Sequence, residues 1–373
     1  MKIIFYSDSL EYGGAEKYLN DIVSGFCSEK NKLYVVCSTF KAFGEAEKKT
    51  GVEIIKIRPK SVFDFLSFLQ LLIFFLKISP DIVFINFRNT FSCQHGAIAA
   101  FFAFRKTIGF LHAAELPNKC EKIGVLLRRF IAQNLSSRIG RLICPSKYVA
   151  DIAISTYKCN PDKVRKIYHG VEQKPLSSLF IKAFINDYDL YNKKIIVCVS
   201  RLAPEKGLEV LIVSFKKVLE KIPDAMLIIV GAGSLLYDLR ALALSLMIAD
   251  SVLFLGFRED VQNFIEMSDV VVVPSLNESL SYAVLEAMMQ TKPIIATRVG
   301  GIPEVIIENC GLLVPPNNAA KLSDEIINLL YDNKKAMELA INGHKRGLSC
   351  FSKDKMFYEI KKCVNEFIER GML

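Results

Sequence analysis

Short apolar runs alternate with amphipathic stretches along the whole chain, and this alternation predicts an α/β fold with parallel sheets. The apolar runs are typical of buried strands, and the stretches between them have helical periodicity. A first series of strands is expected at residues 2–7, 33–37, 53–57, 82–86, 107–111 and 142–144. A second series is expected at residues 194–199, 226–230, 252–255, 270–273, 293–296 and 311–314.

The pattern lapses over residues 173–192, where Pro175 and a polar run interrupt it, so we place an interdomain linker there. We therefore expect two Rossmann-like domains, at residues 1–172 and 193–353, that face each other across a cleft. Ligands of such sheets bind beyond the carboxyl ends of the strands. The residues that follow each strand are thus the candidates for function.

Composition narrows the class of protein. The chain has 373 residues, of which 51% are hydrophobic, yet no run reaches the roughly 20 apolar residues that span a bilayer. The most apolar stretch, residues 63–78, favours a buried crossover helix. Residues 1–8 resemble a first strand more than a signal peptide, so we expect a cytoplasmic protein.

Charge and cysteine usage exclude several partners. Ten cysteines without a Cys-x-x-Cys pair suit reduced core thiols, and four scattered histidines predict no metal site. The net charge of +9 suits a phosphorylated ligand or an anionic membrane surface. No basic stretch is interleaved with stacking aromatic residues, so we do not expect a nucleic acid partner.

The clearest chemical signal follows the strand at 270–273. Glu278 is expected in the next loop, and Glu286 in the following helix, about 7–8 Å farther along its axis. Two carboxylates beside a helix N-terminus suit the hydroxyl groups of a sugar–diphosphate–ribose. Two ordinary surface glutamates are the alternative. Ser279 or Ser281 can cap this helix, whose first residues also include Leu280 and Tyr282.

Two cations follow the strand at 194–199. Arg201 offers a planar fork and Lys206 a point charge, with Glu205 between them and a helix starting near Gly207. Such a pair suits the two phosphates of a diphosphate. Because two cations at the carboxyl end of a strand are costly to leave without an anion, we favour a binding role.

Other junctions carry weaker signals. Gly13 and Gly14 let the backbone approach a ligand ahead of a helix, or form a tight turn without one. His112 follows the strand at 107–111 and either contacts a sugar hydroxyl or phosphate or is structural. For the pair at 300–301 a structural turn is favoured. The turns expected near a nucleotide base contain Gly231, Gly256, Phe257 and Arg258.

In this order, the motifs resemble the retaining glycosyltransferases of family four, which have the GT-B fold and include bacterial lipopolysaccharide, capsule and exopolysaccharide enzymes. The shared motifs are Gly13-Gly14-Ala15-Glu16, Arg201-x4-Lys206, Gly231-x-Gly233, Glu278-x7-Glu286 and Gly300-Gly301. The resemblance implies a nucleotide-sugar donor held by the C-terminal domain and an acceptor held by the N-terminal one. It also implies that a final helix at 354–373 packs back on the first domain.

The same resemblance implies a role for each matching residue. Glu278 would contact the donor sugar and Glu286 the ribose, while Arg201 and Lys206 would hold the diphosphate. Gly14 would close over the donor, Phe257 would border the base, and His112 would lie near the donor sugar.

The resemblance favours front-face substitution, because Glu278 lacks the second carboxylate that retaining glycosidases place opposite the first. The catalytic set is then Glu278, His112, Arg201 and Lys206. Neither a metal nor a cofactor is implied, since the nucleotide sugar is a co-substrate. A UDP-sugar is favoured, with a GDP-sugar next.

Basic and apolar residues at 101–106, 123–131, Arg138 and Arg141 lead to a hypothesis about the acceptor. They suit peripheral contact with an anionic membrane, and hence a glycan or lipid-linked glycan acceptor at the inner face of the cytoplasmic membrane. A crossover helix with one buried face is the alternative.

Two other functions remain as competing hypotheses. An NAD-dependent oxidoreductase or epimerase predicts Gly-x-Gly-x-x-Gly after the first strand and an acid near the end of the second. Gly13 and Gly14 lack that spacing, and Cys37-Ser38-Thr39 ends the second strand. A non-catalytic, two-domain sugar-binding protein is the other alternative.

Overall fold

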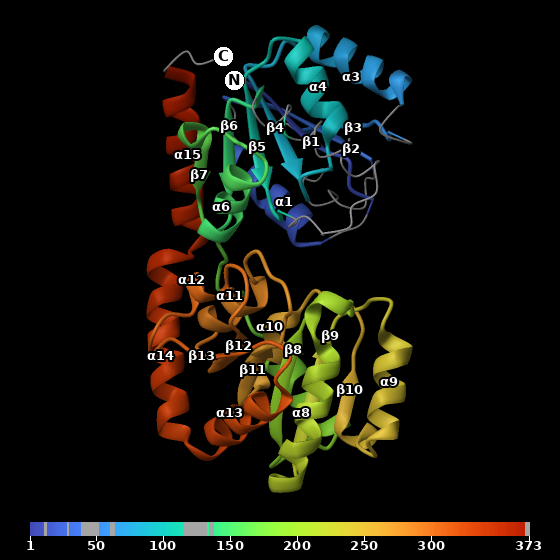
Figure 1. The fold of residues 1–373 in the computed structure, drawn as a ribbon, viewed down its shortest axis with the longest axis vertical. Helices are drawn as coiled ribbons and strands as arrows, with labels where there is room; N and C mark the ends of the chain where they lie inside the picture. Colours follow the sequence, from blue (N-terminus) through green and yellow to red (C-terminus); the bar gives the residue numbers. More distant parts are fainter. Residues whose placement is uncertain are drawn as a thin grey trace. The chain divides into compact units, whose positions relative to one another are not determined.

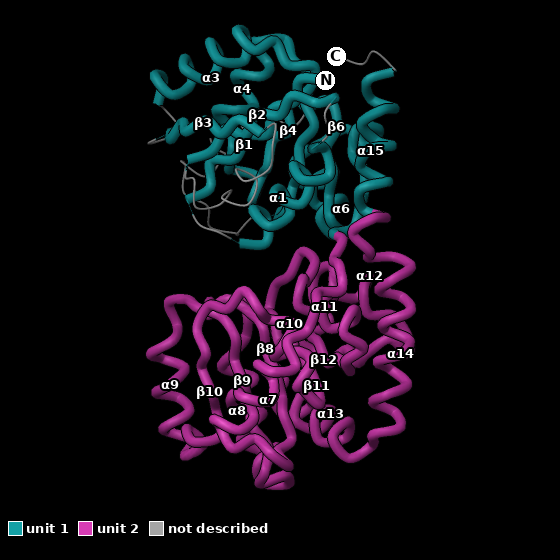
Figure 2. Tube along the Cα trace, turned by 180° about the vertical axis from the view of Figure 1, so that it is seen from behind, with its two compact units in different colours: residues 1–169, 356–373 teal, residues 170–355 magenta. Residues whose placement is uncertain are grey.

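The computed structural model describes residues 1–10, 13–27, 30–38, 52–59, 64–114, 133 and 138–369. The chain forms two compact units, shown in different colours in Figure 2. Unit 1 contains Met1–His169 and Met356–Leu373, and unit 2 contains Gly170–Lys355. Each unit is a parallel sheet with helices on both faces (Figure 1), so the predicted α/β fold with two Rossmann-like domains is confirmed.

Unit 1 is built on a seven-stranded sheet in the order β3-β2-β1-β4-β5-β6-β7. Alternating side chains of its strands bury against both faces; in β1, Ile3 and Phe5 belong to one core and Ile4 and Tyr6 to the other. The strands are β1 (Lys2–Ser7), β2 (Lys32–Cys37), β3 (Val52–Lys56), β4 (Ile82–Phe87), β5 (Thr107–Leu111), β6 (Arg141–Cys144) and β7 (Val164–Lys166).

Helices cover both faces of the unit 1 sheet. On one face lie α1 (Gly14–Phe26) and, from Met356 onward, α15 (Lys353–Glu369), whose Ile360 and Phe367 are fully buried in the shared core. On the other face lie α3 (Phe65–Ile78), α4 (Gln94–Phe102) and α6 (Lys147–Ser155). The N-terminal strand and the C-terminal helix therefore share one hydrophobic core.

Unit 2 has a six-stranded sheet in the order β10-β9-β8-β11-β12-β13. Its strands are β8 (Lys194–Val199), β9 (Ala225–Val230), β10 (Val252–Phe254), β11 (Val270–Val273), β12 (Ile294–Thr297) and β13 (Leu312–Val314). Helices α8 (Leu208–Lys221), α9 (Leu236–Ser245) and α13 (Ala319–Tyr331) bury one face, and α7 (Ser178–Asp187) and α10 (Val261–Met267) contribute to the core on the other. The remaining helices are α11 (Tyr282–Met289), α12 (Ile302–Val305) and α14 (Asn333–Cys350).

Each sheet reverses its direction of strand addition at one point. In unit 2 this point lies between β8 and β11, which pair in parallel with Val271 opposite Val197; in unit 1 it lies between β1 and β4. The loops that leave two such neighbouring strands diverge to opposite faces, which opens a crevice where ligands bind. The candidate residues after β8 and β11 therefore meet at the reversal point of the unit 2 sheet.

The predicted linker at 173–192 is wrong. Residues Ser178–Asp187 form α7, which belongs to unit 2 because Phe180 and Phe184 pack edge-on against Phe264 of α10. The unit boundary lies instead between His169 and Gly170. The sequence also missed β7, a three-residue strand too short for a recognisable period. The basic and apolar stretch at 123–131, named above for membrane contact, lies outside the described residues.

Candidate active site

A lysine–glutamate ion pair joins the loops after β8 and β11. Lys206 Nζ lies 2.5 Å from Glu278 Oε2, and the two side chains are only 15% and 13% exposed. Lys206 ends the 3-10 helix Pro204–Lys206, and Gly207 behind it has a left-handed φ of 63°. A Cβ on Gly207 would lie 2.2 Å from the Pro274 carbonyl oxygen, so the close approach of the two loops requires glycine there.

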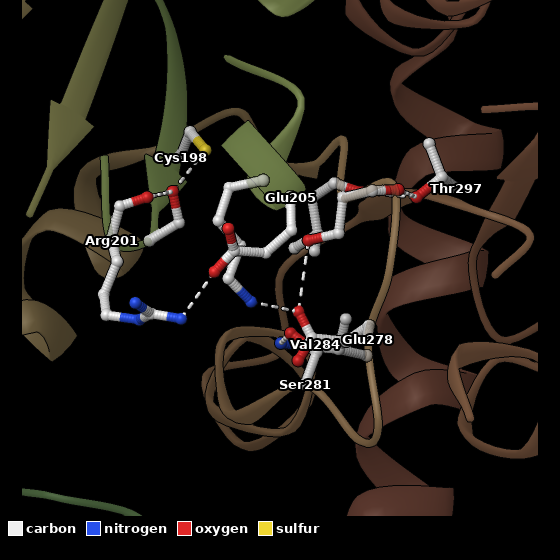
Figure 3. A network of polar contacts seen from close by, with 11 residues as sticks. Cys198, Arg201, Glu205, Glu278, Ser281, Val284 and Thr297 are labelled. Carbon is white, nitrogen blue, oxygen red and sulfur yellow. Dashed lines mark hydrogen bonds and ion pairs between the residues drawn. The ribbon is translucent and has the colours of Figure 1, made fainter. Parts of the chain in front are cut away.

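The Glu278 carboxylate is further held by Ser275 of its own loop, and the backbone of that loop is held by groups from β12 and the loop after it. Ser275 Oγ donates to Glu278 Oε2 at 3.1 Å, and Thr297 Oγ1 in turn donates to the Ser275 carbonyl (Figure 3). Gly301 N donates to the Glu278 carbonyl at 3.0 Å, and a Cβ on Gly300 would lie 1.7 Å from that oxygen. The Gly300–Gly301 turn is thus structural, as favoured above, and it supports the backbone of Glu278.

Arg201 lies beside this pair but is more exposed. Its guanidinium donates to Glu205 Oε1 at 2.6 Å, a contact drawn in Figure 3. The Glu205 carbonyl accepts from the backbone N–H of Leu276 at 2.8 Å, which ties the two loops together again. One junction therefore presents an arginine at the surface, paired with Glu205, and a lysine in a half-buried ion pair with Glu278.

The helix after Glu278 begins as a capped α-helix. Ser281, not Ser279, is the N-cap, and its Oγ accepts from Val284 N at 3.5 Å. Leu280 is buried, whereas Ser279 and Tyr282 are half-buried. Glu286 lies half-buried within α11. Because the first N–H groups of a helix have no partner within it, this N-terminus suits an anion beside Lys206.

Of the unit 2 residues predicted to lie near the nucleotide base, some shape the backbone or are exposed, and one is bound within the unit. Gly231 N donates to the Gly256 carbonyl at 2.8 Å, and Gly231 approaches Ser200 so closely that a Cβ would lie 1.8 Å from its carbonyl oxygen. Phe257 is largely exposed. Arg258, by contrast, is engaged within the unit, because both Nε and Nη2 donate to the Asp260 carboxylate at 2.9 Å. That bidentate pair lowers the pKa of Asp260.

In unit 1, Gly13 is the N-cap of α1 and Gly14 is its first residue. Neither has a left-handed φ, so the backbone does not itself require glycine at these positions. His112, just after β5, is buried, and its Nε2 lies 2.7 Å from Asn86 Oδ1 of β4. Since an amide oxygen only accepts, His112 Nε2 carries the proton and Nδ1 is left as an acceptor.

His112 belongs to a buried aromatic cluster. The Tyr18 ring lies edge-on 5.0 Å from His112 and 4.7 Å from His169, and the two imidazoles are 5.4 Å apart. Burial lowers the pKa of His112 to about 3. Burial, with the neighbouring His112 imidazole, also lowers the pKa of His169. Both rings are therefore neutral near pH 7, which suits contact with a sugar hydroxyl rather than a phosphate.

These depressed pKa values predict acid sensitivity of folding. The unfolded chain binds protons on His112 below pH 6.5 while the folded chain does not, so stability is full above pH 6.5 and is lost as the pH falls toward 3. Between pH 6.5 and 5, His112 alone should cost roughly 2 kcal/mol. Urea unfolding at several pH values should show this slope reduced in His112→Gln; an unchanged slope would contradict the buried neutral state.

Sequence reasoning missed Ser275, Thr297 and Asn86. Ser275 stands only three residues before Glu278, so the sequence alone indicates that the two are close. Thr297 contacts Ser275 only because β12 is the neighbour of β11. Asn86 faces His112 because β4 and β5 pair with Phe87 opposite Leu111. Both contacts depend on strand order, which no local pattern in the sequence indicates.

Comparison with known proteins matches both halves of the chain. Residues 181–346 match the family model described as "Glycosyl transferases group 1", and residues 12–174 match "Glycosyltransferase Family 4". The N-acetyl-alpha-D-glucosaminyl L-malate synthase of Bacillus anthracis is 31% identical over 48% of this chain and 46% of its own length. A GDP-mannose-dependent alpha-(1-6)-phosphatidylinositol monomannoside mannosyltransferase of Mycobacterium tuberculosis is 31% identical over 42% and 44%, respectively. The chain spans about half the length of the curated relatives it matches.

Among solved structures, Anabaena Alr3699/HepE in complex with UDP-glucose has a TM-score of 0.84 and is 24% identical, covering 98% of this chain and 100% of that one. This likeness extends through both Rossmann-like units and identifies the fold as GT-B. With the two family models matching the two halves of the sequence in order, the chain belongs to the GT-B glycosyltransferases of family four.

Proposed function

We propose that this chain is a retaining glycosyltransferase that moves a sugar from a nucleoside-diphosphate sugar to a glycan or lipid-linked glycan acceptor in cell-surface polysaccharide synthesis. The observation that carries the proposal is the half-buried Lys206–Glu278 pair at the reversal point of the unit 2 sheet. A carboxylate for sugar hydroxyls, a cation for phosphate and a capped helix N-terminus stand together there.

Lys206 and Glu278 are assigned to different parts of the donor. Lys206 has three N–H donors and Glu278 accepts from it at 2.5 Å, so the ammonium can also contact a phosphate oxygen. Arg201 supplies a second, exposed cation for the same diphosphate. Glu278, held by Ser275 and by the Gly301 N–H, is assigned to the donor sugar, and Glu286 to the ribose.

The proposed reaction is a front-face substitution. The bond between the anomeric carbon and the β-phosphate oxygen breaks while the acceptor oxygen bonds to the same face of that carbon. The acceptor's proton passes to the departing phosphate oxygen. Charge that develops on the diphosphate is stabilised by Arg201, Lys206 and the N-terminus of α11. Metal and cofactor play no part in this scheme, and His112 and Gly14 keep the roles that the resemblance implies.

The nature of the donor and acceptor is supported by the relatives. A mannosyltransferase relative uses a GDP-sugar, and a structural neighbour is described with UDP-glucose, so UDP- and GDP-sugars are the donors to test. The same mannosyltransferase acts on a glycolipid, which supports a lipid-linked acceptor and peripheral contact with the inner face of the cytoplasmic membrane. The polar groups of Arg201, Lys206 and Glu278 do not distinguish between bases.

Nucleotide binding tests the donor site without knowledge of the acceptor. In calorimetric titrations, a nucleoside diphosphate should bind at least about tenfold more tightly than its monophosphate, since one more charge-assisted contact to the cations is worth about 1.5–3 kcal/mol. UDP, GDP and ADP should each be compared with UMP, GMP and AMP. Arg201→Ala should reduce the difference in affinity between each diphosphate and its monophosphate. If none of the six binds, or if mono- and diphosphates bind alike, the assignment of the cations fails.

A further inference from the structure

Helix α3 of unit 1 exposes an apolar face to solvent. Its sequence is apolar all round, and sequence analysis favoured a buried helix, but only Ser67, Leu71 and Phe75 are buried. On the opposite side, five large apolar side chains are between 37% and 73% exposed: Phe65, Leu66, Leu69, Ile73 and Leu76. Their spacing of three and four residues aligns them along one face of the helix. Exposed helix faces of this composition mark interaction sites.

The apolar face continues onto α4, which packs beside α3 in both Figure 1 and Figure 2. Phe68 of α3 lies 6.0 Å from Phe65 and 6.1 Å, edge-on, from Phe102 of α4. Phe101, Phe102 and Phe104 at the end of α4 are also exposed. The two helices therefore present a single apolar surface, which we call the α3–α4 face.

A cationic pocket lies at the edge of this face. Its volume is about 340 Å³, and its lining combines Phe101 and Phe104 with Arg105, Arg138 and Lys163. The Arg138 guanidinium lies 4.6 Å from the centre of the Phe101 ring, and Arg105 Nε is buried without a hydrogen-bond partner. None of the described residues that line the pocket is acidic. The guanidinium groups of Arg105 and Arg138 suit a phosphate group.

We propose that the α3–α4 face lies on an anionic lipid bilayer, with its apolar side chains in the headgroup region and a lipid phosphate in the Arg105–Arg138–Lys163 pocket. The inference deepens the membrane contact proposed above and rests on it. With fourteen residues, α3 is about 21 Å long and is suited to lie in the interface plane. No helix in the described part of the chain has the length and apolar content to cross a membrane.

Charge complementarity favours a bilayer over a second copy of the chain. In a symmetric contact, the same patch meets itself, so the pocket cations of two copies would face one another across the apolar surface. Anionic lipids neutralise the same cations while the acyl boundary covers the apolar side chains. Lys77, four residues after Ile73, is exposed and adds a further cation to α3.

Vesicle co-sedimentation of the full chain tests the proposal. The chain should pellet with vesicles of phosphatidylcholine and phosphatidylglycerol at low salt, and less well with phosphatidylcholine alone. Leu66→Gln/Ile73→Gln should lower partitioning at least about tenfold, because each buried CH₂ is worth about 0.8 kcal/mol. Arg105→Gln/Arg138→Gln should abolish the preference for the anionic vesicles. A matched control, Leu179→Gln/Met247→Gln, changes residues of unit 2 that are 82% and 86% exposed and should bind like the parent.

Two results would overturn the proposal: no binding of the parent chain to anionic vesicles at low salt, or loss of binding in the control but not in the α3 variant. Self-association that Leu66→Gln/Ile73→Gln abolishes in the absence of lipid would assign the face to a second copy instead. Donor hydrolysis in lipid-free buffer should be unchanged in all these variants. If the chain binds vesicles but hydrolyses no donor, membrane binding by the α3–α4 face is supported and only the transfer reaction is refuted.

Discussion

Lys206→Ala should reduce turnover of the nucleotide-sugar donor by about 10²–10³-fold, as expected when one group that stabilises developing charge is removed. Lys206 is assigned to the leaving diphosphate and also holds Glu278 at 2.5 Å. The substitution leaves a 13% exposed carboxylate without its cation, which can cost about 3–5 kcal/mol when such a pair is broken. Turnover is measured as nucleoside diphosphate released, and stability as the urea midpoint.

The matched control is Lys321→Ala. Lys321 also forms a pair with a glutamate of unit 2, Glu325, at 2.6 Å, but its side chain is 49% exposed and lies on α13. Its partner Glu325 is 15% exposed, but the Lys321 ammonium reaches solvent and lies outside the candidate site, so turnover should stay near the parent value and stability should fall less than in Lys206→Ala. Turnover of Lys206→Ala at the parent rate would refute the assignment. Loss of turnover accompanied by unfolding at assay temperature would call for Lys206→Met/Glu278→Gln, which removes both charges together.

Gly300→Ala should both destabilise unit 2 and remove activity. Gly300 has a φ of 53°, and a Cβ there would lie 1.7 Å from the Glu278 carbonyl oxygen. The left-handed conformation costs about 1–2 kcal/mol for a non-glycine residue. The contact must also push Glu278 away, and a displacement of about 1 Å at a binding group can cost about 10²-fold in rate. Thermal unfolding and donor turnover report the two effects.

Gly256→Ala separates backbone strain from the steric contact. Gly256 has a similar φ of 70°, but a Cβ there meets nothing within 4 Å. The unfolding temperature of Gly256→Ala should therefore fall only by what the left-handed conformation costs; its turnover is left out of the comparison because Gly256 belongs to a turn expected near the base. If Gly300→Ala lowers the unfolding temperature no more than Gly256→Ala does, and keeps parent turnover, the turn does not position Glu278.

Local patterns predicted most of the fold because buried parallel strands are uninterrupted apolar runs. Val270–Val273 is such a run, and Pro274 and Asn277 break it just before Glu278. The position of the loop that carries this carboxylate could therefore be predicted. The same reasoning placed Arg201 and Lys206 after β8. What it could not supply was the order of strands, which brings Lys206 to within 2.5 Å of Glu278.

The failures have a shared physical cause, since burial depends on residues distant in sequence. Phe180 and Phe184 did not indicate a helix because Pro175 and a polar run flank them, yet α10 offers Phe264 for them to pack against. For α3 the sequence predicted too much burial. Its all-round apolar pattern predicted burial, and no described element covers the side of Leu66 and Ile73.

Release of nucleoside diphosphate from UDP- and GDP-sugars tests the central claim most directly. The parent chain and Lys321→Ala should turn over at least one of these donors, slowly onto water and faster with a lipid-linked glycan, whereas Lys206→Ala should fall by about 10²–10³-fold. Equal rates in Lys206→Ala and the parent, or no turnover of any donor by a folded parent chain, would contradict the assignment of the Lys206–Glu278 site to sugar transfer.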